Sequence, residues 1–355
     1  MSTSSVMLQI LDLARWAPSG DNTQCWRFEL IDANHCVVHG FDTREHCVYD
    51  LDGHPSQISL GALFETIAIA ASAHGVRTNI VRRPDSAPQR PEFDVYLIPD
   101  ATVAPSPLIE SIILRSVQRR PLKTRALSAA EKSALETALG AQFDVQWLEG
   151  IGAKLRTAVI MFNNAKLRLA MPEAYEVHRR VIHWQAERSA DRVPDQALGV
   201  DAITLRLMKW AMHSWQRLSL MNTLTGTWAP RLQMDFVPGI ACAAHFVIKA
   251  KTRPSSIEDY VAAGRAVQRF WLTVTQLGLF MQPEMTPLIF SKYVSDGRHF
   301  TRVKKLHGQA LRLQQQTAKL VFTDATFPVY MGRLGAGKAP QARSERRPLE
   351  ELIQP

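Results

Sequence analysis

The sequence contains few cysteines, and their spacing fits neither a disulfide framework nor a metal site. Its 355 residues include only Cys25, Cys36, Cys47 and Cys242, and no two of them form a C-x-x-C pair. Four cysteines in so long a chain do not suggest a disulfide scaffold. The histidines are scattered and have no clustered carboxylates beside them, so we expect no bound metal.

Long apolar runs and runs of basic charge are also missing. No stretch of about 18 uncharged apolar residues occurs, so we expect no membrane-spanning segment. The first residues lack a basic segment followed by a continuous apolar one, so we expect no signal peptide and a cytoplasmic protein. The formal net charge is +9, which favours an anionic partner such as a phosphorylated ligand. The basic residues are scattered without a nucleic-acid-binding motif, which argues against nucleic acid as a partner.

The hydrophobic pattern predicts a mixed α+β chain. Apolar residues at helical spacing predict helices, and short apolar or aromatic runs predict strands. The predicted helices cover 6–16, 58–74, 108–117 and 256–277, and the predicted strands cover 26–30, 36–41, 93–98, 242–250 and 327–334. Ser128 with Glu131 forms a capping box for one more helix. A proline-rich stretch at 99–107 is interpreted as a linker, and 160–235 as a helix-rich insertion.

An internal repeat is visible in the apolar helices. In the helix predicted at 58–74, Gly61 precedes Gly75 by 14 residues. In the helix predicted at 256–277, Gly264 precedes Gly278 by the same 14 residues. Each unit follows an apolar strand and precedes a strand of similar pattern, FDVY in the first half and FPVY in the second. Chance is the alternative, since apolar helices that end at glycine are common. Three elements in the same order favour duplication.

The most informative segment is APSGDNTQCWRF at 17–28. Small and polar residues follow a helix and precede an aromatic strand, so their amide and hydroxyl groups could lie along the edge of a flat heterocycle. A plain helix-to-strand turn is the alternative, because proline, serine, glycine, aspartate and asparagine all favour turns.

This segment resembles the A-P-S-x-x-N-x-Q-P-W-x-F signature of the nitroreductase family. Cys25 stands where the family usually has proline. The resemblance implies an FMN cofactor, and it implies that the residues at the matching positions contact the flavin. These residues are Pro18, Ser19, Asn22 and Gln24.

A second match lies at 114–119 (LRSVQR), which resembles the family's opening R-x-S-x-R segment. The resemblance implies that Arg115, Ser116 and Arg119 bind the FMN phosphate, and arginine suits a phosphate because its planar fork donates charged hydrogen bonds. Val117 stands where the family usually has a hydroxyl residue. The alternative is a solvated basic helix end.

A third match covers Leu277 to Met285 and resembles the family segment L-G-x-x-x-x-P-x-x. The resemblance implies flavin contacts by Pro283, Glu284 and Met285. It also implies a catalytic role for Met285, whose backbone N–H would point at flavin N5 and stabilise the charge that arrives there.

The last match is the C-terminal stretch RSERRPLEEL at 343–352, which resembles the family's R-x-P-L-E-E segment. It implies that Arg346 is a phosphate ligand, with Arg343 and Arg347 as weaker candidates. The alternative is a basic tail without a role, which its terminal position favours.

The resemblance also implies how the chain is organised. The family's usual homodimer builds each flavin site from both subunits, and here the motifs divide between a first half at 1–104 and a second half at 105–355. We therefore expect a nitroreductase-like α+β fold with two mostly antiparallel sheets, fused into a pseudo-dimer with one intact site. The insertion at about 160–235 lies outside the resemblance.

The function implied is FMN-dependent hydride transfer from NAD(P)H to a small-molecule acceptor that the sequence does not identify. We see no convincing general acid or base in the motifs. The chain is also similar to fused-half nitroreductases found beside ThiF/E1-like adenylating domains, some of them labelled as molybdopterin-biosynthesis proteins, and to a lidded branch thought to sequester FMN. The alternatives are therefore an FMN store or sensor covered by a lid, and a partner of an E1-like protein. The expected assembly is a monomer or a homodimer.

Overall fold

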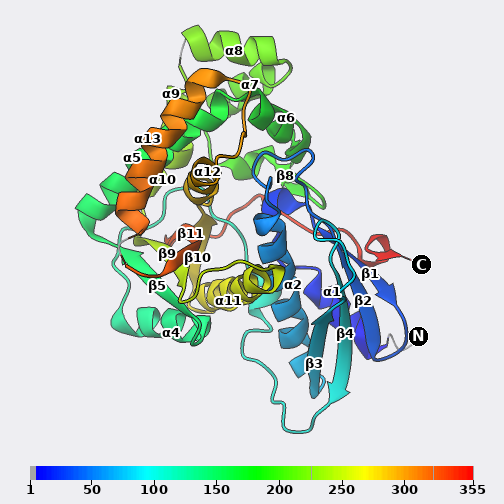
Figure 1. Ribbon diagram of the computed structural model, residues 1–355. Helices are drawn as coiled ribbons and strands as arrows, with labels where there is room; N and C mark the ends of the chain where they lie inside the picture. The colour runs from blue at the N-terminus through cyan, green and yellow to red at the C-terminus, as the bar shows by residue number, and fades with distance from the viewer. Residues whose placement is uncertain (1–4, 225, 323, 355) are drawn as a thin grey trace.

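The computed structural model describes residues 5–224, 226–322 and 324–354, and it has two main β-sheets with two long helices packed between them. Figure 1 shows α2 and α11 side by side at the centre, with one sheet beside α2 and the other beside α11. The mixed α+β class predicted from the hydrophobic pattern is confirmed. Among the described residues, no helix has the length and apolarity that crossing a bilayer requires.

The first sheet belongs to the N-terminal part of the chain, except for one strand. Its order is β13-β1-β2-β4-β3, antiparallel apart from the parallel pair β1 and β13. Its strands are β1 Trp26–Leu30, β2 His35–Gly40, β3 Val76–Arg82, β4 Glu92–Pro99 and β13 Ile353–Gln354. The C-terminal segment therefore crosses back to complete the sheet of the first half.

The second sheet is fully antiparallel, with the order β10-β11-β9-β5. Its strands are β5 Phe143–Leu148, β9 Ala244–Ala250, β10 Leu279–Pro283 and β11 Phe327–Ala336. Every residue of β9 is buried, which fits an interior strand covered on both faces. The five strands predicted from sequence are confirmed. The pattern gave no prediction for β3, an edge strand whose exposed side chains are largely polar.

The helices begin where the sequence supplies caps. In α1, Val6–Ala14, the Ser5 side chain accepts from the Leu8 N–H, and α11, Ile257–Gln276, starts with a capping box. The capping box predicted at Ser128 begins α4, Ala129–Leu139. Helix α2, His54–Ser72, is buried almost all round because it lies between the first sheet and α11.

The contact between α2 and α11 is made at the two glycines of the predicted repeat. The Cα atom of Gly264 lies 2.9 Å from the position a Cβ atom would take on Gly61, and the reverse distance is also 2.9 Å. A Cβ on Gly61 would sit 2.0 Å from the Val261 carbonyl oxygen, and one on Gly264 would sit 2.0 Å from the Ile58 carbonyl oxygen. The two helices therefore meet reciprocally, each at the residue that matches the other in sequence.

The insertion is helix-rich, as predicted, and Figure 1 shows it above the two central helices. It begins within α5 Gly150–Leu169 and contains α6 Pro172–Val181, α7 Ala202–Ala211, α8 Trp215–Leu224 and α9 Trp228–Arg231, and α10 Val237–Ile240 follows it. Two later helices, α12 Thr286–Ser295 and α13 Lys304–Val321, follow β10. Short strands β6 Ile182–His183, β7 Arg188–Ser189 and β8 Val193–Pro194 join α6 to α7, and β7 pairs with β12 Arg343–Ser344.

The helix predicted over 108–117 is wrong in extent. Only α3, Ser111–Leu114, is helical, and Arg115 has an extended backbone with φ −55° and ψ 126°. The reason is tertiary: Val117 forms a parallel bridge with Met281, and the Gln118 N–H donates to the Met281 carbonyl at 3.1 Å. Pairing with β10 therefore competes successfully against helix continuation, and it brings two predicted site segments together.

The reciprocal glycine contact predicts a large loss of stability when either glycine gains a methyl group. We expect Gly61→Ala and Gly264→Ala each to lower the free energy of unfolding by about 3 kcal/mol or more, because backbone atoms cannot move aside as a flexible side chain can. Urea unfolding measures this. Gly308→Ala is the control, since nothing lies within 4 Å of its Cβ position in α13. Equal unfolding midpoints for the three variants would contradict the packing described.

Candidate functional site

A cavity of about 320 Å³ is lined by residues from the N-terminal segment 18–62 and from several later segments of the chain, and it collects most of the predicted site residues. This volume is within the range typical of small-molecule and cofactor sites. Nine of the eleven predicted residues line it, while Gln24 and Glu284 do not. The nine are Pro18, Ser19, Asn22, Arg115, Ser116, Arg119, Pro283, Met285 and Arg346.

The loop that follows α1 enters the cavity in an unusual backbone conformation. Asp21, Asn22 and Gln24 have φ values of 51°, 63° and 47°, in the left-handed region that non-glycine residues rarely adopt. The Ser19 hydroxyl holds the loop by accepting from the Gln24 N–H at 2.9 Å. Such strain persists only where the surrounding structure enforces it, and it concentrates at functional sites.

Two amide side chains tie this loop to distant segments. The Asn22 Nδ2 donates to the carbonyl oxygens of Ala190 at 3.2 Å and Glu345 at 3.1 Å, while its Oδ1 is buried without a partner. The Gln24 Nε2 donates to the Ala190 carbonyl at 2.8 Å, and its Oε1 accepts from the Arg347 N–H at 2.9 Å. Gln24 therefore holds the insertion and the C-terminal segment in place, and Asn22 does so while also facing the cavity.

Three arginines gather at one side of the cavity without a carboxylate beside them. Arg115 and Arg346 are 4% and 8% exposed, and Arg343 lies with them. Arg115 donates to the Trp16 carbonyl at 2.9 Å, Arg346 to the Ala17 carbonyl at 2.9 Å and Arg343 to the Ile113 carbonyl at 2.9 Å. Among the described residues, none of the three forms an ion pair, and the Nε atoms of Arg115 and Arg343 are buried without a partner.

The electrostatics of this arginine cluster favour an anion. Burial, with Arg343 adding to it, lowers the pKa of Arg115 to about 9. Burial, then Arg115 and Arg343, lowers the pKa of Arg346 well below its ordinary value. A guanidinium whose pKa is lowered in this way carries a charge that its surroundings disfavour. A bound phosphate dianion would supply the missing countercharge and accept the unused N–H groups.

Arg119 lies in a different electrostatic environment. Burial lowers its pKa to about 10, and Asp21 partly offsets that effect. Its Nη1 donates to the Ala197 carbonyl at 3.2 Å. Arg119 therefore lines the cavity but sits near a carboxylate, which makes it a weaker phosphate ligand than the three clustered arginines.

The segment after β10 presents a helix N-terminus to the cavity. Met285 is the N-cap of α12, and both it and Thr286 line the cavity. The first N–H groups of a helix have no acceptor within the helix, and they carry partial positive charge. The Met285 Sδ accepts from the Met331 N–H at 3.4 Å, so the side chain anchors this backbone to the second sheet.

Glu284 points away from the cavity into a buried charge network. Its carboxylate contacts His245 Nδ1 at 2.6 Å and Arg333 Nη1 at 2.8 Å, and all three side chains are almost fully buried. Burial opposes charge on His245, but the Glu284 carboxylate raises the pKa of His245 to about 10. Glu284 thus anchors the backbone that carries Met285 and does not line the cavity.

Several lining residues were not predicted as site residues. Ile58 and Ala62 of α2, and Val267 and Trp271 of α11, supply an apolar wall. Tyr49, Arg168 and His178 form a polar group, in which the Tyr49 hydroxyl lies 3.0 Å from His178 Nε2. Burial, then Arg168, lowers the pKa of His178 to about 3, so the imidazole is neutral. Arg168 and His178 lie in the insertion, which the family motifs do not cover.

No family model matches the chain. It is 24% identical over 347 residues to the uncharacterized protein MT1398 of Mycobacterium tuberculosis (strain CDC 1551 / Oshkosh), covering 96% of this chain and 47% of that protein. It is 27% identical over 201 residues to the uncharacterized protein MT3212 of the same strain, covering 55% of this chain and 58% of that one. The chain therefore spans about half the length of the curated relatives it matches.

The solved structures to which the chain is similar are nitroreductase-like proteins. The FMN-dependent nitroreductase NfnB of Mycobacterium smegmatis, in complex with NADPH, is 13% identical with a TM-score of 0.38, covering 69% of this chain and 96% of that one. A nitroreductase with bound FMN from Bacteroides fragilis NCTC 9343 is 11% identical with a TM-score of 0.35, covering 66% and 89%. Likeness at this level carries no argument about function, which rests on the cavity itself.

The buried network predicts a specific pH dependence of stability. The folded pKa of His245, about 10, exceeds its ordinary 6.5, so its contribution is complete below pH 6.5 and is lost as the pH rises through about 10. We expect Glu284→Gln to cost about 3 kcal/mol of unfolding free energy at neutral pH, since it leaves buried charges unpaired. The difference from the wild type should shrink as the pH rises.

Urea unfolding at several pH values measures both effects. Glu136→Gln on the exposed face of α4 is the control, and it should keep the wild-type pH dependence. A Glu284→Gln protein with the same slope as the wild type between pH 6.5 and about 10 would show that His245 is not held charged by Glu284.

Proposed function

We propose that the chain is an FMN-binding oxidoreductase of nitroreductase type, with the flavin in the cavity between the two halves. The observation that carries the proposal is the cluster of Arg115, Arg343 and Arg346 at a cavity of cofactor size. Arg115 and Arg346 are buried, Arg343 is half-buried, and none of the three pairs with a carboxylate among the described residues. Burying such cations without a countercharge is costly, and a phosphate monoester at one end of a flat ligand relieves that cost.

The remainder of the cavity fits the other parts of FMN. Apolar residues from α2 and α11 offer flat contact area for a ring system, and Trp271 also lies under Arg115, with the guanidinium carbon 4.5 Å from its ring centroid. The Oδ1 of Asn22 and the Oε1 of Gln282 are buried acceptors without partners. An isoalloxazine edge carries N–H and C=O groups that can satisfy such amides, so the residues present fit the flavin.

The chain's own residues supply position, polarity and exclusion of water. A bound flavin would supply the two-electron chemistry at its N5 atom. The first turn of α12, including the Met285 N–H, provides positive potential and a hydrogen-bond donor where negative charge develops during hydride transfer. Val193 and Ala197 of the insertion also line the cavity, and they limit the access of water to it.

The proposal includes a fused pair of related halves with one flavin per chain. The reciprocal contact at Gly61 and Gly264, between helices that match in sequence, supports a two-fold relation between the half at 1–104 and the half at 105–355. The cavity takes the loop around Asn22 from the first half and the arginine cluster from the second. A site built by two fused subunits requires such a contribution of binding residues from each half.

An FMN store is the second candidate, and one observation favours it. The side chains of Asn22 and Gln24 bind the backbone of the insertion through the Ala190 carbonyl, which fastens the insertion beside the cavity. A fastened insertion would retain flavin and slow the entry of a reductant. The oxidoreductase remains the preferred function because a net charge of +9 favours an anionic donor such as NAD(P)H.

The arginine cluster predicts selective recognition of the phosphate. We expect Arg115→Gln and Arg346→Gln each to weaken FMN binding by about 1.5–3 kcal/mol, as the loss of a charged hydrogen bond does. Riboflavin, which lacks the phosphate, should bind all variants with nearly equal affinity. Flavin fluorescence titration measures both ligands, and its endpoint should be one FMN per chain. Arg312→Gln on exposed α13 is the control of equal charge. Equal loss of both ligands would reject the phosphate assignment.

Reduction kinetics separate the oxidoreductase from the store. If the cavity admits a donor, NADPH or NADH in stopped flow should bleach the bound flavin, and a quinone or nitroaromatic acceptor should restore the colour. In a store, dithionite would still reduce the flavin while both nucleotides fail. Gln24→Ala, which removes one of the two side-chain bonds to the Ala190 carbonyl without removing a cavity residue, should then speed reduction by the nucleotide but not by dithionite. Failure of both nucleotides with wild type and variant would contradict the oxidoreductase.

A further inference from the structure

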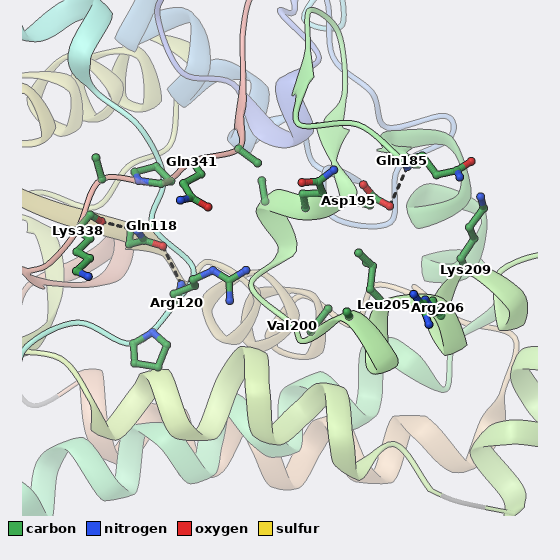
Figure 2. Close-up of a pocket in the computed structure, with 17 residues that line it drawn as sticks. Gln118, Arg120, Gln185, Asp195, Val200, Leu205, Arg206, Lys209, Lys338 and Gln341 are labelled. Atoms are coloured by element: carbon green, nitrogen blue, oxygen red, sulfur yellow. Dashed lines mark hydrogen bonds between the residues drawn. The ribbon is translucent and has the colours of Figure 1, made fainter.

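A second and larger cavity of about 790 Å³ adjoins the first. It lies between the stretch 185–209 of the insertion and two segments of the second half, 118–121 and 338–342. Figure 2 shows Lys338 and Gln118 at one side, Arg120 near the middle, and Arg206 and Lys209 at the other side. None of the family motifs explains this space.

The second cavity carries an excess of positive charge. Arg120, Arg206, Lys209 and Lys338 line it, and none of these four forms an ion pair with any residue that the structure describes. Its one carboxylate, Asp195, is 3% exposed and already accepts from the backbone N–H groups of Gln185 and Ala186, at 2.9 and 3.1 Å. The carboxylate is thus committed to the protein backbone, and the four cations are left to act on a ligand.

The uncharged lining suits a ligand that is more than a bare anion. Three glutamine side chains, from Gln185, Gln196 and Gln341, offer both donors and acceptors, while the amide of Gln118 already bonds the Lys338 carbonyl and the Arg120 N–H. Val200 and Leu205 add apolar surface beside them. A purine or ribose uses such a mixture of amide and aliphatic groups, while phosphates use the lysines and arginines.

The two cavities share a boundary made of small side chains. Ala197 and Ala342 line both cavities. Residues that are adjacent in sequence can line different cavities. Arg119 lines the first cavity and Arg120 the second, so one short segment contributes a cation to each. The two cavities are therefore adjacent, and only small side chains are shared between their linings.

We infer that the second cavity binds the nucleoside diphosphate portion of an extended nucleotide whose other end reaches the first cavity. This inference rests on the proposed function, which gives the first cavity its flavin. The cations at 120, 206, 209 and 338 neutralise the phosphates, and the glutamines bind the nucleoside. The insertion is then a binding element for the reductant and not only a cover.

Calorimetric titration of the flavin-loaded protein with ADP tests the inference directly, without turnover. ADP should bind, inorganic pyrophosphate should bind more weakly, and adenosine should bind most weakly. The double variant Arg206→Gln/Lys209→Gln should weaken ADP about tenfold or more, because two phosphate contacts are lost. The control is Lys304→Gln/Lys305→Gln, which removes the same charge from the exposed start of α13 and should leave ADP affinity unchanged.

Two results would overturn the inference. One is the absence of ADP binding to flavin-loaded wild type, and the other is an equal loss of affinity in both double variants, which would indicate only the overall basic charge. The FMN content of each protein, read from its visible absorbance, separates this inference from the proposed function. A chain that holds no flavin but binds ADP through Arg206 and Lys209 would contradict the proposed function and leave the nucleotide site supported.

Discussion

The close approach of α2 and α11 at Gly61 and Gly264 determines where the rest of the protein can lie. Side chains at either position would force the helices apart, because the partner's backbone occupies the space that a Cβ atom needs. The first sheet packs against one of these helices and the second sheet against the other. The same two helices supply Ile58, Ala62, Val267 and Trp271 to the first cavity. The helix spacing therefore sets the width of the site as well as the separation of the sheets.

Buried arginines in this protein differ in whether a carboxylate neutralises their charge, and two that have no carboxylate partner within the part of the chain that the structure describes lie at the candidate site. Arg333 is nearly inaccessible but pairs with Glu284, which in turn holds His245, so the charges of that network are neutralised within the protein. Arg115 and Arg346 are comparably buried, yet they donate only to backbone carbonyls. Among the described residues, Arg115 and Arg346 lack the carboxylate partner that Arg333 has, and this contrast supports the proposal of an anionic ligand.

Local signals in the sequence predicted most of the regular structure. The capping box at Ser128 and the apolar periodicity placed the main helices, since both depend on neighbours within a few residues. The extent of the helix at 108–117 could not be predicted, because Val117 leaves helical geometry to pair with Met281, which is distant in sequence. The edge strand β3 was missed because its exposed, polar face lacks an apolar signature.

The candidate site was predictable where it follows motifs and not where it depends on tertiary packing. Nine of the motif residues gather at one cavity, namely Pro18, Ser19, Asn22, Arg115, Ser116, Arg119, Pro283, Met285 and Arg346. Gln24 and Glu284 belong to the same motifs, but their side chains turn toward the protein, which spacing alone does not reveal. Tyr49 and His178 could not be placed beforehand, because they meet across a separation of 129 residues that only the packed insertion closes.

The parallel pairing of β13 with β1 ties the C-terminal segment, and with it Arg346 of the first cavity, to the start of the chain. Glu345 and Arg346 contact Asn22 and Ala17 across more than 300 residues of chain, and closing a loop of that length is entropically demanding. The segment that carries Arg343 and Arg346 is joined to the first sheet by a two-residue strand. A phosphate-bearing ligand bound there would add its binding free energy to the docking of that segment. Retention of such a ligand and protection of the C-terminal segment from proteases would then report the same equilibrium.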